Sequence, residues 1–195
     1  YPVYKRPGVQ KFLMSVASQF EVAVWTAGTR DYAEPILNWL DPYGFITTRI
    51  YRDSCTEMEQ DGYVKDLSKL NRSLSEVVIV DNNPYSFQCQ PDNGIQCLDF
   101  YFDQCDTELQ RIRQFLHIIK DVRDTRTVVP QFQEWAETGH LNLMDQEDCF
   151  EDALVDIVPD MSEDQDDSAE FLVQDCDSMV ADSANAAVTV EDDAQ

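Results

Sequence analysis

Polar side chains follow two stretches that the sequence marks as β-strands. Thr26 comes directly after the apolar run 21–25, and Asp81 and Asn82 come directly after the β-branched run 77–80. Ligands of open α/β sheets bind beyond the carboxyl ends of the strands, so these side chains are expected at one edge of a sheet. A hydroxyl with the backbone N–H groups of a turn can hold an anion, and a carboxylate with an amide oxygen suits Mg²⁺.

Lys65 lies between these two stretches in the sequence and is a candidate positive charge for a phosphoryl oxygen. Each of these residues also has a simpler explanation. A Thr after a strand is commonly a cap or turn residue, an isolated Lys is usually a solvated surface charge, and Asp-Asn-Asn-Pro at 81–84 is by itself a turn sequence. Their order and their place at strand ends favour phosphoryl chemistry when they are taken together.

The spacing of apolar residues indicates the elements that position these side chains. The expected elements are helices over 9–16, 31–40 and 106–122, strands over 21–25, 77–80 and 95–98, and a hairpin-type insertion within 47–64. In the helix over 31–40, the side chains expected to face the core are Tyr32, Ile36, Leu37 and Leu40. Alternating helices and strands predict an α/β domain with a mainly parallel sheet.

The charge is uneven along the chain. All 14 Lys and Arg and 18 of the 38 acidic residues lie within 1–126, so 127–195 holds 20 acidic residues and no basic one. We therefore expect a folded domain over 1–126 and a mostly disordered acidic tail over 127–195. Direct binding of the tail to nucleic acid is excluded, since that needs clustered Lys and Arg. Short apolar clusters at 150–158 and 171–173 suit binding to a protein partner.

The six cysteines and two histidines show no spacing typical of a zinc site. The thiols are therefore expected to be reduced residues of an intracellular protein. No stretch of this segment approaches the roughly 20 apolar residues of a membrane-spanning helix.

Five blocks of the sequence resemble a known family and occur in the family's order. They are KRPGV at 5–9, VWTA at 24–27, RDSC at 52–55, YVKDLS at 63–68 and VDNNP at 80–84. They closely resemble the small C-terminal-domain phosphatases, protein serine phosphatases of the haloacid dehalogenase superfamily that act on the RNA polymerase II tail and other phosphoproteins. The resemblance covers roughly residues 1–123. It implies a haloacid dehalogenase-like Rossmannoid parallel sheet with a small β insertion.

The resemblance also implies roles for single residues at the strand ends. Thr26 is similar to the hydroxyl that binds the transferring phosphoryl group, and Lys65 to the lysine that stabilises its charge. Asp81 and Asn82 are similar to the acidic and amide residues of a Mg²⁺ site, so Mg²⁺ is the implied cofactor.

Two further resemblances concern the substrate. Arg52 resembles an arginine that contacts the substrate phosphate, and Tyr32 matches a position that lines the peptide pocket. The implied partner is a phosphoprotein such as the RNA polymerase II C-terminal tail. The implied location is nuclear rather than cytoplasmic, with mitochondria as the alternative.

One motif of the family does not occur in the sequence. The family's first strand ends in Asp-x-Asp-x-Thr, whose first Asp is the covalent nucleophile and whose second is the general acid. The motif is expected shortly before Lys5. We therefore expect the sequence to be part of a longer protein, with the central strand of the sheet missing from it. The other interpretation is a relative that has lost its activity.

Three functions fit these observations. The leading hypothesis is a Mg²⁺-dependent phosphoserine/phosphothreonine protein phosphatase that uses an aspartyl-phosphate intermediate and is inactive as this segment alone. The alternative is a non-catalytic relative, the presequence receptor of the mitochondrial inner-membrane translocase, which typically lacks the Asn-x-Pro found here at 82–84. The third is a scaffold whose acidic-hydrophobic tail is the functional part. Within the phosphatase hypothesis, the tail is either inert or competes with substrate for the site.

Overall fold

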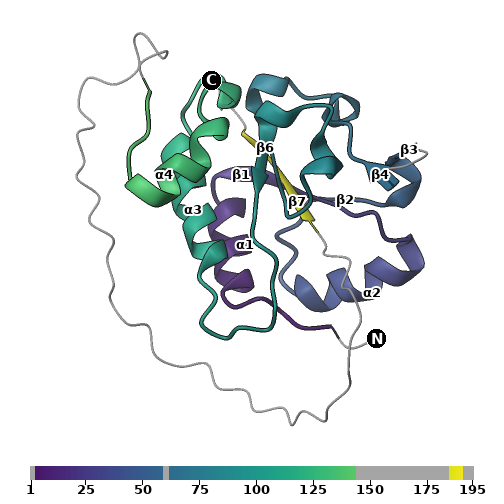
Figure 1. Ribbon diagram of the computed structural model, residues 1–195. Helices are drawn as coiled ribbons and strands as arrows, with labels where there is room; N and C mark the ends of the chain where they lie inside the picture. The colour runs from purple at the N-terminus through teal and green to yellow at the C-terminus, as the bar shows by residue number, and fades with distance from the viewer. Residues whose placement is uncertain (1–2, 59–61, 144–184, 191–195) are drawn as a thin grey trace. The chain divides into compact units, whose positions relative to one another are not determined.

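A five-stranded sheet lies at the centre of the computed structural model, which describes residues 3–58, 62–143 and 185–190 (Figure 1). The strands are β1 (Phe20–Trp25), β2 (Thr48–Ile50), β3 (Thr56–Met58), β4 (Gly62–Val64), β5 (Val77–Asp81), β6 (Gly94–Gln96) and β7 (Asn185–Val190). The α-helices are α1 (Val9–Ala17), α2 (Arg30–Leu40), α3 (Glu108–Ile119) and α4 (Phe132–Thr138). Short 3₁₀ helices span Arg52–Ser54, Leu67–Leu70, Leu74–Glu76, Pro84–Phe87, Pro91–Asn93, Thr125–Thr127 and Val129–Gln131. All described residues belong to one compact unit.

The strand order of the sheet is β2-β1-β7-β5-β6. β1 pairs with β2 in parallel, and β5 pairs with β6 in parallel. β7 lies between the two pairs and is antiparallel to both β1 and β5. The expected α/β fold with parallel strand pairs is confirmed, but the sheet is mixed because its middle strand runs the other way.

β7 occupies the central place that the sequence was expected to leave without a strand. Its six residues pair with β1 over the whole of that strand, and four of them also pair with β5. Residues 185–190 lie within the expected acidic tail and form this strand in the structure. Without it, β1 and β5 would each present an unpaired row of backbone N–H and C=O groups.

Both faces of the sheet are buried, as the two-residue period of a strand allows. On one face, Val24 and Val80 belong to a large apolar cluster that includes residues of α1, α2 and α3. On the other face, Val77 and Ile79 pack with Leu67 in a smaller cluster. Every residue of β5 is buried, so the prediction of a central strand at 77–80 is confirmed.

The helices begin and end close to the expected positions, with one error in the orientation of α2. In α3, Ile112 and Leu116 are fully buried, as the helical spacing predicted. In α2, Ala33 and Leu37 face the core, but Tyr32 is 45% exposed. Successive helical residues are rotated by about 100°, so Tyr32 lies beside the buried stripe and the expectation that it faces the core is wrong. No described helix is long and apolar enough to cross a membrane.

The hairpin insertion is smaller than expected. β3 and β4 form an antiparallel pair in which Thr56 lies opposite Val64. The earlier β-prone piece, Thr48–Ile50, instead extends the main sheet beside β1, where Ala23 lies opposite Thr48. The connection through α2 makes this parallel pairing possible, because parallel strands need a long crossover and not a tight turn.

Folded structure continues beyond residue 126. Val129 and Phe132 are buried in the large cluster, and the Phe132 ring meets that of Phe115 edge to face at 5.1 Å. Trp135 of α4 packs against the same cluster. The expected disorder is therefore wrong for 127–143. A few large apolar residues of this segment pack against α3, although they follow no periodic pattern from which this could be predicted. The apolar clusters at 150–158 and 171–173 lie outside the described residues.

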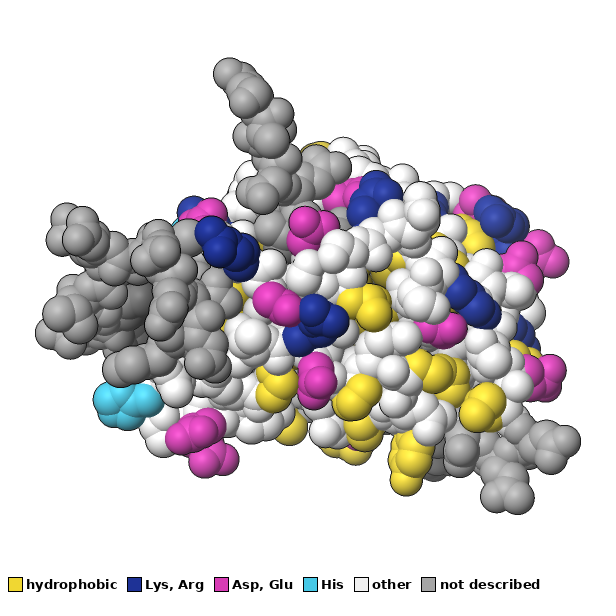
Figure 2. Space-filling model, turned by 90° about the horizontal axis from the view of Figure 1, so that it is seen from above, with side chains coloured by type: hydrophobic (Ala, Val, Ile, Leu, Met, Phe, Trp, Pro, Cys, Tyr) yellow, Lys and Arg dark blue, Asp and Glu magenta, His cyan; other side chains and the backbone are white. Residues whose placement is uncertain are grey.

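The face seen in Figure 2 mixes Lys and Arg with Asp and Glu. Ion pairs of the described residues include Arg72 with Glu21 at 2.8 Å and Arg126 with Asp124 at 2.6 Å. Interspersed charges of both signs agree with the nearly balanced composition of residues 1–126.

Arg6 forms a bidentate ion pair with Asp106, just before α3. Its Nε lies 2.8 Å from Oδ1 and its Nη2 lies 2.7 Å from Oδ2, while Nη1 donates to the Leu98 carbonyl at 2.7 Å. The Arg6 hydrogen bonds hold the pKa of Asp106 below its usual range, although partial burial opposes them. The pair ties the N-terminal segment to the loop that precedes α3.

We expect Asp106→Asn to lower the free energy of unfolding by about 1 kcal/mol at pH 7. Because the folded pKa is depressed, this contribution is present above about pH 4 and is lost as the pH falls through the folded value. Urea unfolding of the variant and the parent chain should therefore differ at pH 7 and converge as the pH falls through the folded pKa of Asp106. Asp121→Asn, at an exposed position, is the matched control. A difference that does not change with pH would contradict this account.

Candidate functional site

Thr26 and Asp81 lie at the same edge of the sheet, on either side of β7. β1 ends at Trp25, whose register partner is Asn185, the first residue of β7. On the other side, Val80 of β5 is paired with Ala186. Since neighbouring strands lie about 4.8 Å apart, the two strand ends are separated by roughly 10 Å.

Lys65 and Asp81 form a buried ion pair. The Lys65 Nζ lies 2.7 Å from Asp81 Oδ2, and the two side chains are only 2% and 0% exposed. The Lys65 N–H donates to the Ser86 carbonyl at 2.6 Å, which fixes the backbone from which the side chain extends. Asp81 Oδ1 accepts a second hydrogen bond, from the Asn83 N–H at 2.8 Å. Lys65 is therefore not a solvated surface charge, whereas its role toward a phosphoryl group stays a prediction.

Thr26 is buried in the turn that leads from β1 to α2. Its N–H donates to the Ile50 carbonyl at 2.9 Å, and its Oγ1 accepts from the Gly28 N–H at 3.0 Å. A Cβ at position 28 would lie 3.2 Å from that hydroxyl oxygen, so glycine permits the close approach. These contacts fit a turn residue, and the hydroxyl hydrogen can still be donated to a ligand.

Arg52 is brought to the same turn from the insertion. Its Nε donates to the Ala27 carbonyl, and its backbone N–H donates to the Gly28 carbonyl at 3.1 Å. The guanidinium carbon lies 4.9 Å from the centroid of the Tyr63 ring. Arg52 is thus oriented beside Thr26, although the two residues are far apart in the sequence.

Tyr32 also lies near this turn. A Cβ at Gly28 would lie 3.4 Å from Tyr32 Cδ1, and the tyrosine side chain is half exposed. An exposed ring beside the strand edge is compatible with substrate contact and not with the core position expected from helical spacing.

The cysteines near this edge of the sheet are held as thiols. The Cys55 Sγ lies 3.9 Å from the Thr26 carbonyl oxygen, and burial raises its pKa. Burial raises the pKa of Cys97 to about 11. Because the thiolate is the nucleophilic form, the raised pKa makes both thiols weaker nucleophiles at neutral pH.

Asn82 is joined to Asp99 by a contact that sequence analysis did not predict. The Asn82 Nδ2 donates to Asp99 Oδ1 at 2.8 Å, and the Tyr101 hydroxyl donates to Asp99 Oδ2 at 3.0 Å. The hydrogen bonds from Asn82 and Tyr101 lower the pKa of Asp99, and the carboxylate raises the pKa of Tyr101. Thr26 was chosen as a candidate because it directly follows an expected strand. Asp99 directly follows the expected strand 95–98, so the same criterion would also have identified Asp99.

The described residues do not by themselves form a Mg²⁺ site. Asp81 already has Lys65 and the Asn83 N–H on its two oxygens. The Asn82 amide nitrogen is engaged by Asp99. Over the described ranges, no three His, Cys, Asp or Glu side chains gather as a metal-binding group. A Mg²⁺ ion would need further ligands in addition to Asp81 and Asn82.

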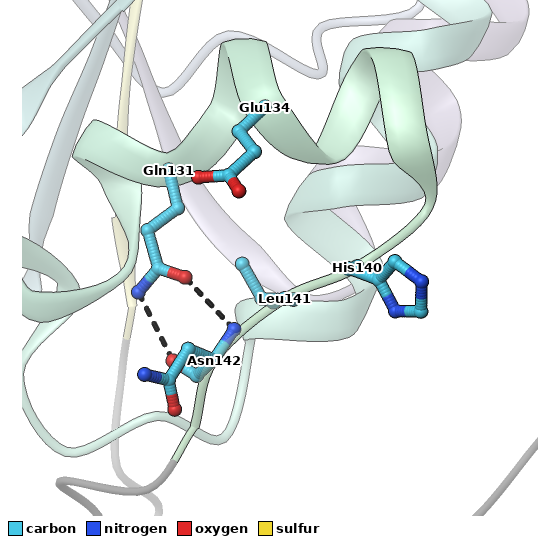
Figure 3. Close-up of a pocket in the computed structure, with 5 residues that line it drawn as sticks. All are labelled: Gln131, Glu134, His140, Leu141 and Asn142. Carbon is cyan, nitrogen blue, oxygen red and sulfur yellow. Dashed lines mark hydrogen bonds between the residues drawn. The ribbon is translucent and has the colours of Figure 1, made fainter.

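A surface hollow of about 400 Å³ lies elsewhere, between α4 and the segment that follows it (Figure 3). It is lined by Gln131, Glu134, His140, Leu141 and Asn142. Gln131 Oε1 accepts from the Asn142 N–H at 2.8 Å, and its Nε2 donates to the Asn142 carbonyl at 3.0 Å. The hollow contains none of the strand-end residues, and its contacts anchor the segment after α4.

Comparison with known proteins identifies relatives over the first two thirds of the chain. A family model described as NLI interacting factor-like phosphatase matches residues 1–126. "CTD small phosphatase-like protein 2" of Dictyostelium discoideum is 44% identical over 122 residues, which are 63% of this chain and 21% of that protein. The human "Carboxy-terminal domain RNA polymerase II polypeptide A small phosphatase 1" is 37% identical over 129 residues, which are 66% of this chain and 49% of that protein.

A further relative is the human "CTD small phosphatase-like protein", 42% identical over 107 residues, which are 55% of this chain and 38% of that protein. The chain thus matches between 21% and 49% of the length of these three relatives. The family match ends at residue 126, so α4 and β7 lie outside it.

Proposed function

Because the chain belongs to the family of NLI interacting factor-like phosphatases, we propose that its folded unit is a protein phosphatase domain acting on phosphoserine and phosphothreonine. The observation that carries the proposal is the buried ion pair of Lys65 and Asp81 at the strand edge. An ammonium group held in a site of low dielectric constant stabilises phosphoryl charge more strongly than a solvated one.

The other strand-edge residues have distinct parts in this proposal. The Thr26 hydroxyl donates to a phosphoryl oxygen, and Lys65 neutralises the charge that develops on the group during transfer. Asp81 orients Lys65 and does not accept the phosphoryl group, because both of its oxygens are engaged. Arg52 contacts the substrate phosphate and Tyr32 the peptide chain beside it.

The proposed covalent step requires an Asp-x-Asp-x-Thr motif, which these 195 residues do not contain. The first Asp attacks phosphorus, the ester P–O bond breaks, and the second Asp protonates the leaving serine or threonine oxygen. Water then cleaves the aspartyl phosphate, which releases inorganic phosphate and restores the carboxylate. Mg²⁺ is part of the proposal and would supply charge neutralisation when bound.

The proposed substrate is a phosphoprotein such as the RNA polymerase II C-terminal tail, and the proposed location is the nucleus. The first is supported by a human relative whose name refers to an RNA polymerase II polypeptide. The presequence-receptor alternative is not retained, since Asn82 and Pro84 are both present and the relatives named above are phosphatases.

Phosphate binding without turnover is the expected behaviour of the 195-residue chain. Titration with a phosphoserine peptide should show binding that Arg52→Gln weakens about tenfold, because a charge-assisted hydrogen bond is lost. Arg49→Gln is the matched control, since Arg49 contacts Asn38 and not the turn after β1. Aryl phosphate should be hydrolysed only by a longer form with Asp-x-Asp-x-Thr before Lys5. Mg²⁺-dependent turnover by the 195-residue chain alone would contradict the assignment of the nucleophile.

A further inference from the structure

The connection between β6 and α3 presents an exposed aromatic side chain near the end of β5 (Figure 1). Tyr101 is 78% exposed, yet its hydroxyl is held in place. The hydroxyl donates to Asp99 Oδ2 at 3.0 Å, and Asp99 Oδ1 accepts from the Asn82 Nδ2 at 2.8 Å. Because Asn82 directly follows β5, these contacts keep the Tyr101 hydroxyl close to the strand end. An exposed ring with a fixed polar end is well suited to contact a ligand.

The backbone is attached to the rest of the domain on both sides of Tyr101. Before it, the Cys97 N–H donates to the Asp81 carbonyl at 3.2 Å, which continues the pairing of β5 and β6 by one residue. After it, Asp106 forms the bidentate ion pair with Arg6. Tyr101 therefore extends from a segment that is tied to the strand edge at one end and to the N-terminal segment at the other.

This connection carries negative charge that it does not offset itself. Residues 97–108 include four acidic side chains and no Lys or Arg. Two of the four, Asp106 and Glu108, form ion pairs with arginines of other segments. The other two, Asp99 and Asp103, are exposed and accept hydrogen bonds from neutral donors, which leave the carboxylate charge in place. The surface around Tyr101 therefore favours a positively charged ligand group.

The β1 side of the candidate site has the opposite charge. Arg30 opens α2 directly after the turn at 26–29, and Arg52 is held at the same turn through its contact with the Ala27 carbonyl. The site thus has basic side chains beside the end of β1 and carboxylates beside the end of β5. A ligand with an anionic group and a cationic group, held apart by a short spacer, matches both regions.

The strand order gives the length of that spacer. The proposed phosphate position lies between the ends of β1 and β5, and β6 is two strand positions away from the middle of this interval. With neighbouring strands about 4.8 Å apart, the separation is roughly 10 Å. An extended peptide advances about 3.3 Å per residue. A side chain about three residues from the phosphorylated residue therefore reaches the β6 side of the site.

We propose that Tyr101 and Asp99 are specificity-determining residues that bind a basic side chain of the phosphopeptide, about three residues from its phosphoserine or phosphothreonine. The guanidinium or ammonium group lies against the Tyr101 ring and pairs with the Asp99 carboxylate. The proposal rests on the proposed function and narrows its substrate class to phosphoproteins with Arg or Lys near the phosphorylated residue.

Binding of two sets of phosphoserine peptides to the 195-residue chain tests the proposal. In one set a single Arg occupies a different position in each peptide of an uncharged host sequence, on either side of the phosphoserine. In the other set Gln replaces that Arg. On one side of the phosphoserine, Arg about three residues away should lower the Kd about fivefold relative to Gln at the same position. This gain should fade as the salt rises from roughly 50 to 300 mM.

Variants assign the gain to the two residues. Tyr101→Ala and Asp99→Asn should remove the fivefold gain and leave the Kd of the Gln peptide unchanged. Tyr43→Ala is the matched control, because Tyr43 is 76% exposed and lies between α2 and β2. The proposal is overturned if phosphopeptides bind with no preference for Arg, if the preference survives in both variants, or if Tyr101→Ala weakens the Arg and Gln peptides equally. If no phosphoserine peptide binds at all, the proposed function itself fails.

Discussion

Val188→Pro should cost the folded unit about 3 kcal/mol or more, a large part of the roughly 5–15 kcal/mol that stabilises a typical domain. Val188 is the β7 residue that lies opposite both Val22 of β1 and Val78 of β5. Proline has no N–H to donate, and in a central strand it leaves a buried acceptor on a neighbouring strand unpaired. The strand that the proline distorts is the one that pairs with both β1 and β5.

Two measurements follow the loss of β7 pairing. Urea unfolding monitored by the fluorescence of buried Trp25 should shift to lower denaturant, and the amides of β1 and β5 should exchange faster with solvent. Val173→Pro is the matched control, because it makes the same substitution elsewhere in the acidic region and outside the described residues. Equal stability of the two variants would show that β7 does not hold the sheet together.

Lys65→Met should destabilise the protein by about 3–5 kcal/mol and remove phosphate binding together with it. The methionine fills a similar volume, but the carboxylate of Asp81 is left buried without a countercharge. Urea unfolding of the variant and of the parent chain at pH 7 measures this loss.

The double variant Lys65→Met/Asp81→Asn separates charge from packing. It should recover much of the stability lost in Lys65→Met, since no buried charge remains, yet it should still fail to bind phosphate. Lys69→Met is the matched control, because Lys69 is exposed and its Nζ donates to the Thr56 hydroxyl at 2.8 Å. If the free energy of unfolding of Lys65→Met lay within about 0.5 kcal/mol of that of the parent chain, the ion pair would contribute little to stability.

Most local elements of the fold follow from residue patterns, and the failures have physical causes. The run at 77–80 is buried on both faces, and its continuous β-branched composition predicted this. β2 was assigned to the insertion because a three-residue strand has too short a pattern to show its partner. α4 and β7 were missed because they lie in an acidic region that was judged by its average composition. That average gives little weight to the few apolar residues that pack on α3 or pair with β1.

The sequence predicted individual residues of the candidate site but not the contacts between them. Thr26 and Asp81 were identified from their places after strands, and the structure brings both to one edge of the sheet. Nothing local in the sequence shows that Lys65 is buried against Asp81, because a long-range contact depends on how the insertion packs. The link from Asn82 to Asp99 depends in the same way on the neighbouring strand β6.

The place of β7 in the sheet also constrains how this chain can be made in the cell. A ribosome synthesises β1, β2, β5 and β6 well before residues 185–190, so the nascent chain holds two separate parallel pairs. Each pair then presents an open inner edge that can join a strand from another molecule. Chains released before residue 185 are expected to need chaperones or to be degraded, because they lack the strand that joins the two halves.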